Sequence, residues 1–243
     1  MNADSSNHTV GIARYYTDAP AVRRVFTWGD DDYGQLGNGQ VPGSWAPLPR
    51  SSPAEVSGTI YGPPSAVSAG HTSTLAISGG IYFWGAAYST TPVAGSPQGS
   101  VTPGAYWKIV SLGKAAYVGI LTDGTLWSGG PNAWQIGTDT DWDKVSAGNY
   151  HTMVIKKDGS LWAWGQNNYG QLGDGTTIDR NVNDPVKIDG KWKEVSAGEY
   201  HTVAIREDGI VWAWGRNNEG QLGNGTTINR KIPVRVVNEN YYE

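Results

Sequence analysis

The stretch WKEVSAGEYHTVAIREDGIVWAWGRNNEGQLGNG, from Trp192 to Gly225, nearly repeats WDKVSAGNYHTMVIKKDGSLWAWGQNNYGQLGDG, from Trp142 to Gly175, fifty residues earlier. A fixed period of this length is typical of a repeat architecture, in which each unit is one small supersecondary structure that stacks on its neighbours. Most Trp, His and Gly residues of the chain therefore occupy repeat positions. For each of them a structural role in the repeat is the first interpretation, and an individual functional role is the second.

The unit contains four strand-like pieces. In the last copy they are Trp192–Gly198, His201–Ile205, Val211–Gly215 and Pro233–Val236. Asp208-Gly209, a strong hairpin signal, separates the second piece from the third. The third piece runs into Asn217–Gly223, which is rich in residues that tolerate a positive φ angle. This pattern predicts a unit of four short antiparallel strands.

Five such units cover the chain, at about residues 1–56, 57–93, 94–137, 138–188 and 189–243. The first unit lacks its opening strand, and the second and third lack the Gly-Gln-Leu-Gly loop. The segments Met1–Asn7 and Val237–Glu243 together rebuild the missing piece of the first unit. We therefore expect one domain, 1–243, that is an all-β propeller of about five blades, closed by pairing of the N- and C-terminal segments.

Composition limits the classes of partner. The formal net charge is −4, so the chain has no basic footprint for nucleic acid or an anionic membrane. It contains no Cys, and residues 1–20 contain no apolar core of a signal peptide. No apolar run approaches the length of a membrane span. We expect synthesis in the cytoplasm, with virion association as one destination, and no cofactor.

Two residue types recur once per unit. Trp28, Trp84, Trp164 and Trp214 each precede a Gly at the end of a strand, and we expect them in the core between blades. His8, His71, His151 and His201 are each followed by Thr, and we interpret them as one repeat position that makes a structural hydrogen bond. The alternative is a metal or acid–base site built from converging imidazoles.

Neither the acidic clusters nor the known catalytic motifs indicate a metal site or an active site in this sequence. Asp139, Asp141 and Asp143 resemble the start of a calcium loop, but the Gly and Glu that such a loop requires are missing, so a solvated or edge-protecting strip is expected. Asp30-Asp31-Asp32 is interpreted as solvated surface. The chain contains no nucleophile-elbow, Walker, zincin or Cys-x-x-Cys motif. We therefore expect no catalytic residues, no metal site and no enzyme activity.

The combination Val-Ser-Ala-Gly-x-x-His-Thr, Asp-Gly, Trp-Gly and Asn-x-x-Gly-Gln-Leu-Gly resembles the repeat of the regulator of chromosome condensation family, strongly over 142–236 and partly elsewhere. The resemblance implies a β-propeller, usually of seven blades, so five units imply either a five-bladed ring or a ring completed by another copy. Its members include an exchange factor, ubiquitin-ligase modules, a secreted β-lactamase inhibitor and bacterial or phage surface proteins. They share a rigid disc that binds proteins through its faces and loops.

Function on a repeat scaffold is expected where the repeat is broken. Three places qualify: the swollen hairpin Ala13–Arg24, the Pro-rich excursion Gln40–Pro64 and the segment Ala86–Tyr106. Of the Trp residues, only Trp45 and Trp134 lie outside repeat positions. Because Tyr, Trp and Arg carry most interface energy, the predicted binding residues are Tyr15, Tyr16, Arg23, Arg24, Trp45, Tyr88 and Trp134. The alternative for Trp45 is that it covers a blade edge.

Three functions remain open from the sequence. The first is a non-catalytic protein-interaction scaffold, whose partners are itself or other subunits of an assembly such as a phage particle. The second is a propeller that binds glycans or small ligands through aromatic, Asn and Asp side chains. The third is an enzyme with a site in the central channel. The first is preferred because of the repeats and the absence of catalytic motifs.

Overall fold

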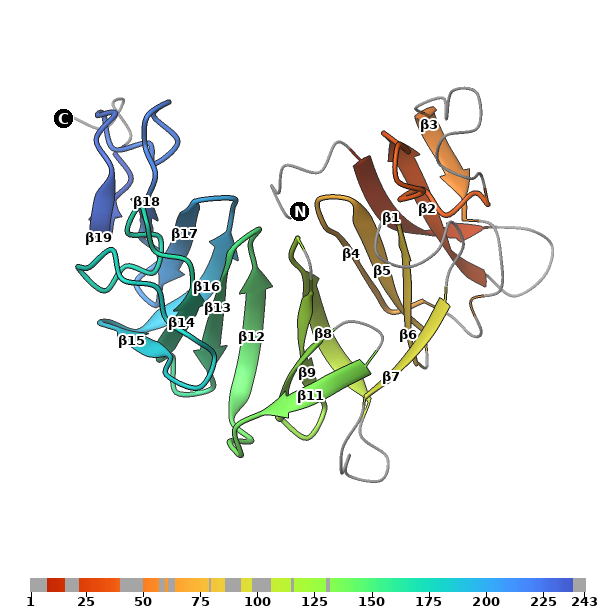
Figure 1. The fold of residues 1–243 in the computed structure, drawn as a ribbon, viewed down its shortest axis with the longest axis horizontal. Helices are drawn as coiled ribbons and strands as arrows, with labels where there is room; N and C mark the ends of the chain where they lie inside the picture. The colour runs from red at the N-terminus through yellow and green to blue at the C-terminus, as the bar shows by residue number, and fades with distance from the viewer. Residues whose placement is uncertain are drawn as a thin grey trace. The chain divides into compact units, whose positions relative to one another are not determined.

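The computed structural model describes residues 8–15, 22–39, 50–56, 60, 64–78, 80–85, 93–97, 106–114, 116–129 and 132–237. Within these residues it contains nineteen strands joined by turns and no helix, so the all-β prediction is confirmed (Figure 1). The described residues accordingly include no helix with the length and apolarity needed to cross a bilayer. The strands fall into two compact units, Met1–Gln135 and Ile136–Glu243, which are described in turn.

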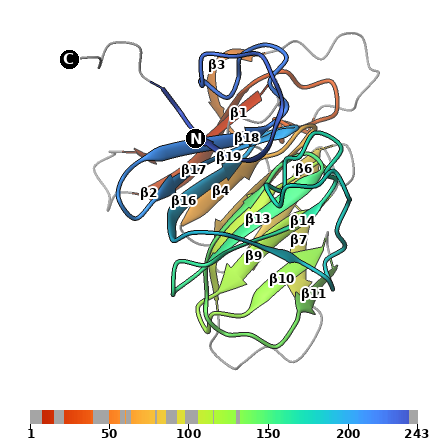
Figure 2. The same cartoon turned by 90° about the vertical axis from the view of Figure 1, so that its left-hand side faces the viewer.

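The second unit consists of two four-stranded antiparallel sheets, blades 4 and 5 (Figure 2). Blade 4 holds β12 (Trp142–Ala147), β13 (His151–Lys156), β14 (Leu161–Gly165) and β15 (Val186–Ile188). Blade 5 holds β16 (Trp192–Ala197), β17 (His201–Arg206), β18 (Val211–Gly215) and β19 (Arg230–Arg235). These are the four predicted pieces of each repeat, with the same register in both blades.

The Trp-Gly pair that ends the third strand of each repeat has a steric reason. Gly165 has a φ of 111°, and a Cβ on it would lie 2.4 Å from the carbonyl oxygen of Tyr150. Only Gly lets β14 approach the turn before β13 this closely. The same close approach recurs at Gly215 against Tyr200. The apolar side chains of the two blades, Trp192, Trp214 and Leu172 among them, form one core cluster.

The first unit begins with blade 1, made of β1 (His8–Tyr15), β2 (Val22–Gly29) and β3 (Arg50–Glu55). This sheet has three strands, as expected because the first sequence repeat lacks its opening strand. The prediction of a swollen hairpin over Ala13–Arg24 is partly wrong, because strand pairing continues outward to Tyr15 and Val22. The extra residues at its ends lengthen the two strands of the repeat.

Blades 2 and 3 of the first unit are joined edge to edge. Blade 2 holds β4 (Ala66–Ala69), β5 (Ser73–Ser78), β6 (Gly80–Gly85) and β7 (Val93–Pro97). Blade 3 holds β8 (Trp107–Leu112), β9 (Tyr117–Leu121), β10 (Leu126–Gly129) and β11 (Asn132–Ile136). A short parallel pair between β7 and β11 links them into one eight-stranded sheet. No sequence pattern predicts this pairing, which involves the two repeats that lack the Gly-Gln-Leu-Gly loop.

Blade 3 compensates for a missing tryptophan. Gly129 pairs with Tyr117 in the register that Trp164 and Thr152 occupy in blade 4. The Tyr117 ring fills this space, stacks on Phe83 and meets Trp107 edge to face, and it is fully buried. Aromatic packing therefore replaces the hydrogen bonds that join the better-preserved repeats.

The predicted seam pairs residues 1–7 with residues 237–243, and all of these except Val237 lie outside the described residues. Closure within one chain therefore stays a prediction.

Candidate functional site

A cluster of three tyrosines and one arginine gathers at one end of blades 4 and 5. Tyr150 and Tyr200 stack with ring centroids 5.1 Å apart and an interplanar angle of 15°. Tyr169 meets the edge of Tyr200 at 5.1 Å, and the Arg216 guanidinium lies 5.9 and 6.0 Å from the rings of Tyr169 and Tyr200. All four side chains are partly exposed. We call Tyr150, Tyr169, Tyr200 and Arg216 the tyrosine cluster.

The repeat itself brings these residues together. Tyr150 and Tyr200 directly precede β13 and β17, and Arg216 directly follows β18. Because the paired strands are antiparallel, the start of β17 and the end of β18 lie at the same edge of the sheet, and the Arg216 amide donates to the Tyr200 carbonyl at 2.9 Å. Tyr169 lies in the loop that leaves β14. Rigid strand ends therefore set the positions of the cluster.

The electrostatics of the cluster are those of a hydrated aromatic surface. The pKa of the Tyr200 hydroxyl is raised, first by its hydrogen bond with Tyr150, then by burial and by the nearby Glu199 carboxylate. The Tyr200 hydroxyl therefore stays neutral at physiological pH. Arg216 forms an exposed ion pair with Glu219 at 3.0 Å, and exposed pairs of this kind contribute little stability. Arg216 can exchange this carboxylate for another one at low cost.

Beside the cluster, a set of hydrogen bonds joins blade 4 to blade 5. The His151 Nε2 and Thr202 Oγ1 atoms are 2.8 Å apart, and the Thr202 hydroxyl donates to the Gln171 carbonyl at 2.8 Å. The same carbonyl accepts the indole N–H of Trp214 at 2.9 Å. Since the Thr202 proton goes to Gln171, His151 is the donor to Thr202. We call this His–Thr–Gln–Trp arrangement the interblade latch.

Blades 1 and 2 are joined by an identical latch. The His8 Nε2 and Thr74 Oγ1 atoms are 2.7 Å apart, and the Gln35 carbonyl accepts from Thr74 at 2.7 Å and from Trp84 at 2.9 Å. Burial, helped by the nearby His71, lowers the pKa of His8 to about 4, against a raising effect of Asp30. Burial, helped by His201, lowers the pKa of His151 to about 3. Both imidazoles are therefore neutral at physiological pH.

The prediction that His71 shares this repeat position is wrong. Ser73 pairs with Gly85 in the register that His151 shares with Gly165, and the Gly70 amide bonds to the Ser73 carbonyl as Gly148 bonds to His151. His71 instead lies in the turn before β5. The sequence Gly70-His71-Thr72 suggested the wrong alignment because blade 2 repeats a Thr two residues later, at Thr74.

The interpretation of Asp31 as solvated surface is also wrong, since this side chain is 1% exposed. Its Oδ1 accepts the Leu36 amide at 2.8 Å, as the Oδ1 of Asn167 accepts Leu172 and that of Asn217 accepts Leu222. Asp31 thus organises the Gly-Gln-Leu-Gly loop of blade 1. Burial raises its pKa, against the lowering effect of its hydrogen bonds and of Arg50.

At the opposite end of blades 4 and 5, cations lie between tryptophans. The Lys156 ammonium is 4.7 Å from the Trp142 ring, and the Arg206 guanidinium is 4.1 Å from the Trp212 ring. Asp139 and Asp141 of the predicted acidic strip pair with Lys156 at 2.6 and 3.0 Å, so these two carboxylates neutralise a lysine.

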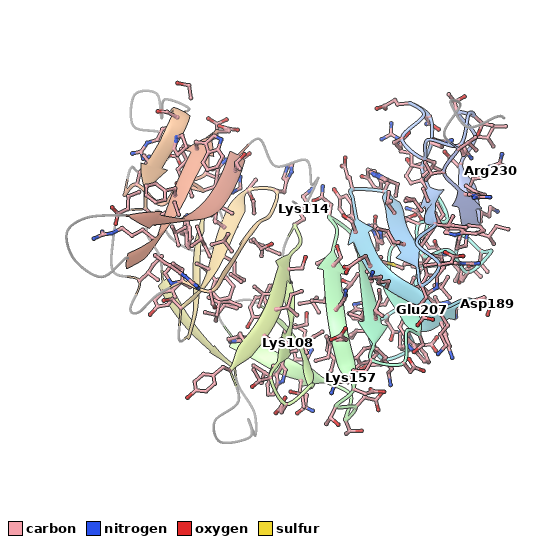
Figure 3. All side chains as sticks on the ribbon, turned by 180° about the vertical axis from the view of Figure 1, so that it is seen from behind. Lys108, Lys114, Lys157, Asp189, Glu207 and Arg230 are labelled. Atoms are coloured by element: carbon pink, nitrogen blue, oxygen red, sulfur yellow. The ribbon has the colours of Figure 1, made fainter. Side chains whose placement is uncertain are left out.

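A cavity of about 180 Å³ lies at this end, and its lining includes Lys157 and Glu207. Both of these residues are labelled in Figure 3. Two of its lysines are already compensated, Lys156 by the aspartates and Lys144 by Glu194. This balance of charge leaves no clear preference for an anion.

The predicted binding residues are distributed over separate blades. Arg23 and Arg24 are exposed on β2, and Arg24 pairs with Glu55 on β3. Trp134 on β11 is 53% exposed. Tyr15 is the last residue of β1, and its side chain is not among the described parts of the structure. The remaining predicted binding residues, Tyr16, Trp45 and Tyr88, lie outside the described residues.

Sequence reasoning missed the tyrosine cluster. The signal was present as a Tyr directly before each His of the two best-preserved repeats, at Tyr150 and Tyr200. Their exposure and mutual stacking depend on how blades 4 and 5 pack side by side, which the sequence pattern does not contain. No group of three or more His, Asp or Glu side chains with the geometry of a metal site occurs in the described part of the chain.

Comparison with known proteins agrees with this repeat structure. The sequence pattern of the regulator of chromosome condensation (RCC1) repeat matches residues 24–77, 158–205 and 208–241, which is more than half of the chain. A second pattern of the same repeat matches residues 142–171 and 192–221. No curated protein matches the chain.

Several solved structures are similar. Human WBSCR16 is 17% identical over 90% of this chain and 64% of its own, with a TM-score of 0.75. Prp20p of Saccharomyces cerevisiae, described with its binding to Gsp1p and histones, is 18% identical over 90% of this chain and 61% of its own, with a TM-score of 0.72. Yeast RCC1 (Prp20) bound to Kap60 is 17% identical over 96% of this chain and 60% of its own, also at 0.72.

The chain therefore spans about 60 to 64% of the length of these structures. At such low identity the likeness shows the fold, which is a β-propeller. Together with the match to the repeat pattern, it shows that the chain belongs to the regulator of chromosome condensation (RCC1) repeat family.

Proposed function

We propose that this protein is a non-catalytic scaffold that binds another protein through the tyrosine cluster. The observation that carries the proposal is the arrangement of Tyr150, Tyr200, Tyr169 and Arg216 as one partly exposed surface on rigid strand ends. Tyr and Arg are enriched among the residues that dominate binding energy at protein interfaces.

Rigidity favours binding at this surface. Each tyrosine presents a large ring with few rotatable bonds, and mutual stacking restricts these rings before a partner arrives. The entropy lost on association is therefore small. The exposed Glu219 holds Arg216 over the rings without burying it, so a partner carboxylate can take the place of Glu219.

The relatives support a protein as the partner in general terms. Prp20p is described as binding Gsp1p and histones, and yeast RCC1 (Prp20) as bound to Kap60. Because identity is below 20% and this chain spans about three fifths of those chains, the partner itself is not transferred.

A finer form of the proposal is a part in a larger assembly, such as a phage particle. Here Arg23, Arg24 and Trp134, which are exposed on blades 1 and 3, provide contacts additional to the tyrosine cluster. The support is the abundance of exposed aromatic and arginine side chains on an otherwise regular repeat.

The test is quantitative affinity purification from the native cells. Tagged wild type is compared with a Tyr169→Ala/Arg216→Ala variant and with Lys157→Ala, a surface control at the opposite end of blade 4. We expect the double variant to lose its specific partner by roughly thirtyfold, in line with a hot spot, and the control to retain it. Equal recovery from all three proteins would place the interface elsewhere. A glycan array run in parallel separates a carbohydrate ligand from a protein partner.

A further inference from the structure

The two interblade latches share a level of burial that marks a completed interface. The contributing side chains are His8, Gln35, Thr74 and Trp84 in one latch, and His151, Gln171, Thr202 and Trp214 in the other. None of the eight is more than 4% exposed. In each latch one blade supplies the His side chain and the Gln carbonyl, and the next blade supplies the Thr hydroxyl and the indole N–H. The interface is therefore directional, with a donor half and a receiving half.

Blade 5 presents the first half of a latch without the second. His201 lies in the register of His151, opposite Gly215 as His151 is opposite Gly165. Gln221 holds the position of Gln171 in the Gly-Gln-Leu-Gly loop. Both side chains are only partly buried, and among residues 136–237 the His201 imidazole makes no hydrogen bond to another blade.

Blade 1 presents the complementary half. Thr9 pairs across to Trp28 in the register of Thr202 with Trp214 and of Thr74 with Trp84. Thr9 is exposed and Trp28 only partly buried, whereas the Thr and Trp of both completed latches are fully buried. Among the described residues of its own unit, neither side chain meets a His and Gln from another blade.

We infer that the His201–Gln221 edge of blade 5 is a docking surface for the Thr9–Trp28 edge of blade 1 of a second copy of this chain. The contact continues the interface between blades 4 and 5 by one more step of the same repeat. In it the imidazole of His201 donates to the Thr9 hydroxyl of the second copy. The Gln221 carbonyl accepts that hydroxyl and the indole N–H of Trp28.

A second copy is favoured as the occupant for two reasons. This chain itself encodes both halves of the latch, so no other protein needs to be invoked. The solved propellers that it matches at TM-scores of 0.72 to 0.75 are longer, since the chain covers only 60 to 64% of them. The same fold thus accommodates more chain than these five repeats. Because the two edges differ, the association is head to tail.

The test uses two variants that block one edge each. Thr9→Arg puts a charged side chain on the exposed edge of blade 1. His201→Ala removes the imidazole from blade 5, and it should fold because Ala116 occupies this repeat position in blade 3. Thr177→Arg, in an exposed loop of blade 4, is the matched control.

Sedimentation velocity over a hundredfold range of concentration gives the readout. We expect wild type and Thr177→Arg to form dimers and larger species, and each blocking variant alone to stay monomeric. An equimolar mixture of the two variants retains one intact pair of edges and should form a dimer and nothing larger. Monomeric wild type at all concentrations would overturn the inference in favour of closure within one chain, and a mixture that stays monomeric would overturn the head-to-tail contact.

Discussion

His151 and Thr202 come from neighbouring blades fifty-one residues apart, and a 2.8 Å hydrogen bond joins them within the buried latch. The Thr202 hydroxyl can accept from His151 because its own proton goes to the Gln171 carbonyl. The histidine repeated in these units is therefore a neutral donor that fixes the distance between blades. Its burial and tautomer do not suit it to metal binding or acid–base work at this position.

Thr202→Val should destabilise the second unit by about 1–3 kcal/mol, because it leaves the His151 N–H and one bond of the Gln171 carbonyl unsatisfied in the core. Thr227→Val, at an exposed position, should change the free energy of unfolding by less than about 0.5 kcal/mol. Urea unfolding followed by tryptophan fluorescence measures both. Equal effects of the two substitutions would contradict the latch.

Stability should fall as the pH drops below about 6.5. In the folded protein the pKa of His151 is lowered to about 3 and that of His8 to about 4, so the unfolded chain binds protons that the folded chain excludes. The contribution is fully present above the unfolded pKa and is lost by roughly 1.4 kcal/mol per pH unit for each histidine below it.

The check is urea unfolding at about pH 7.5 and about pH 5. His151→Gln should weaken the pH dependence of the second unit while leaving that of the first unit. A free energy of unfolding that is unchanged between the two pH values would show that these imidazoles are not buried in the folded state.

Two tryptophans should differ in their effect on stability. Trp214 is fully buried and donates to the Gln171 carbonyl, so Trp214→Ala should cost about 3–5 kcal/mol. Trp134 is 53% exposed, so Trp134→Ala should cost about 1 kcal/mol or less. Thermal unfolding monitored by circular dichroism compares them directly. A larger loss for Trp134 than for Trp214 would contradict the assignment of the core.

Asp31→Asn should stabilise blade 1 at neutral pH by about 1 kcal/mol, since it replaces a buried carboxylate with the residue that holds this position in blades 4 and 5. The pKa of Asp31 is raised in the folded state, so its charged form becomes costly as the pH rises through that pKa. The gain should therefore shrink at low pH. A loss of stability at neutral pH would mean that the carboxylate is preferred there.

Most of the fold could be predicted from the sequence because the repeat is strongly periodic. The Asp208-Gly209 turn and the Trp-Gly strand ends located three of the four strands of blade 5 to within one residue. The decayed units were harder. The sequence prediction places His71 in the repeat by its residue type. The register depends instead on which residue pairs with Gly85, and that residue is Ser73.

The candidate site was less accessible to sequence reasoning. Tyr150 and Tyr200 belong to regular repeats, whereas the sequence predicts binding residues where the repeat is irregular. Asp31 looked like one of three solvated aspartates, because a buried carboxylate differs from its neighbours only through the backbone amides that surround it. Stacking between separate turns is a tertiary property that local patterns do not contain.

Photo-crosslinking in the native cells shows whether the tyrosine cluster contacts a partner protein. A photoreactive phenylalanine analogue is placed at Tyr169 and, as a control, at Lys157 on the opposite end of blade 4. We expect a discrete covalent adduct with a partner protein from position 169 and none from position 157. An adduct from position 157 alone, or the same adducts from both positions, would contradict this expectation.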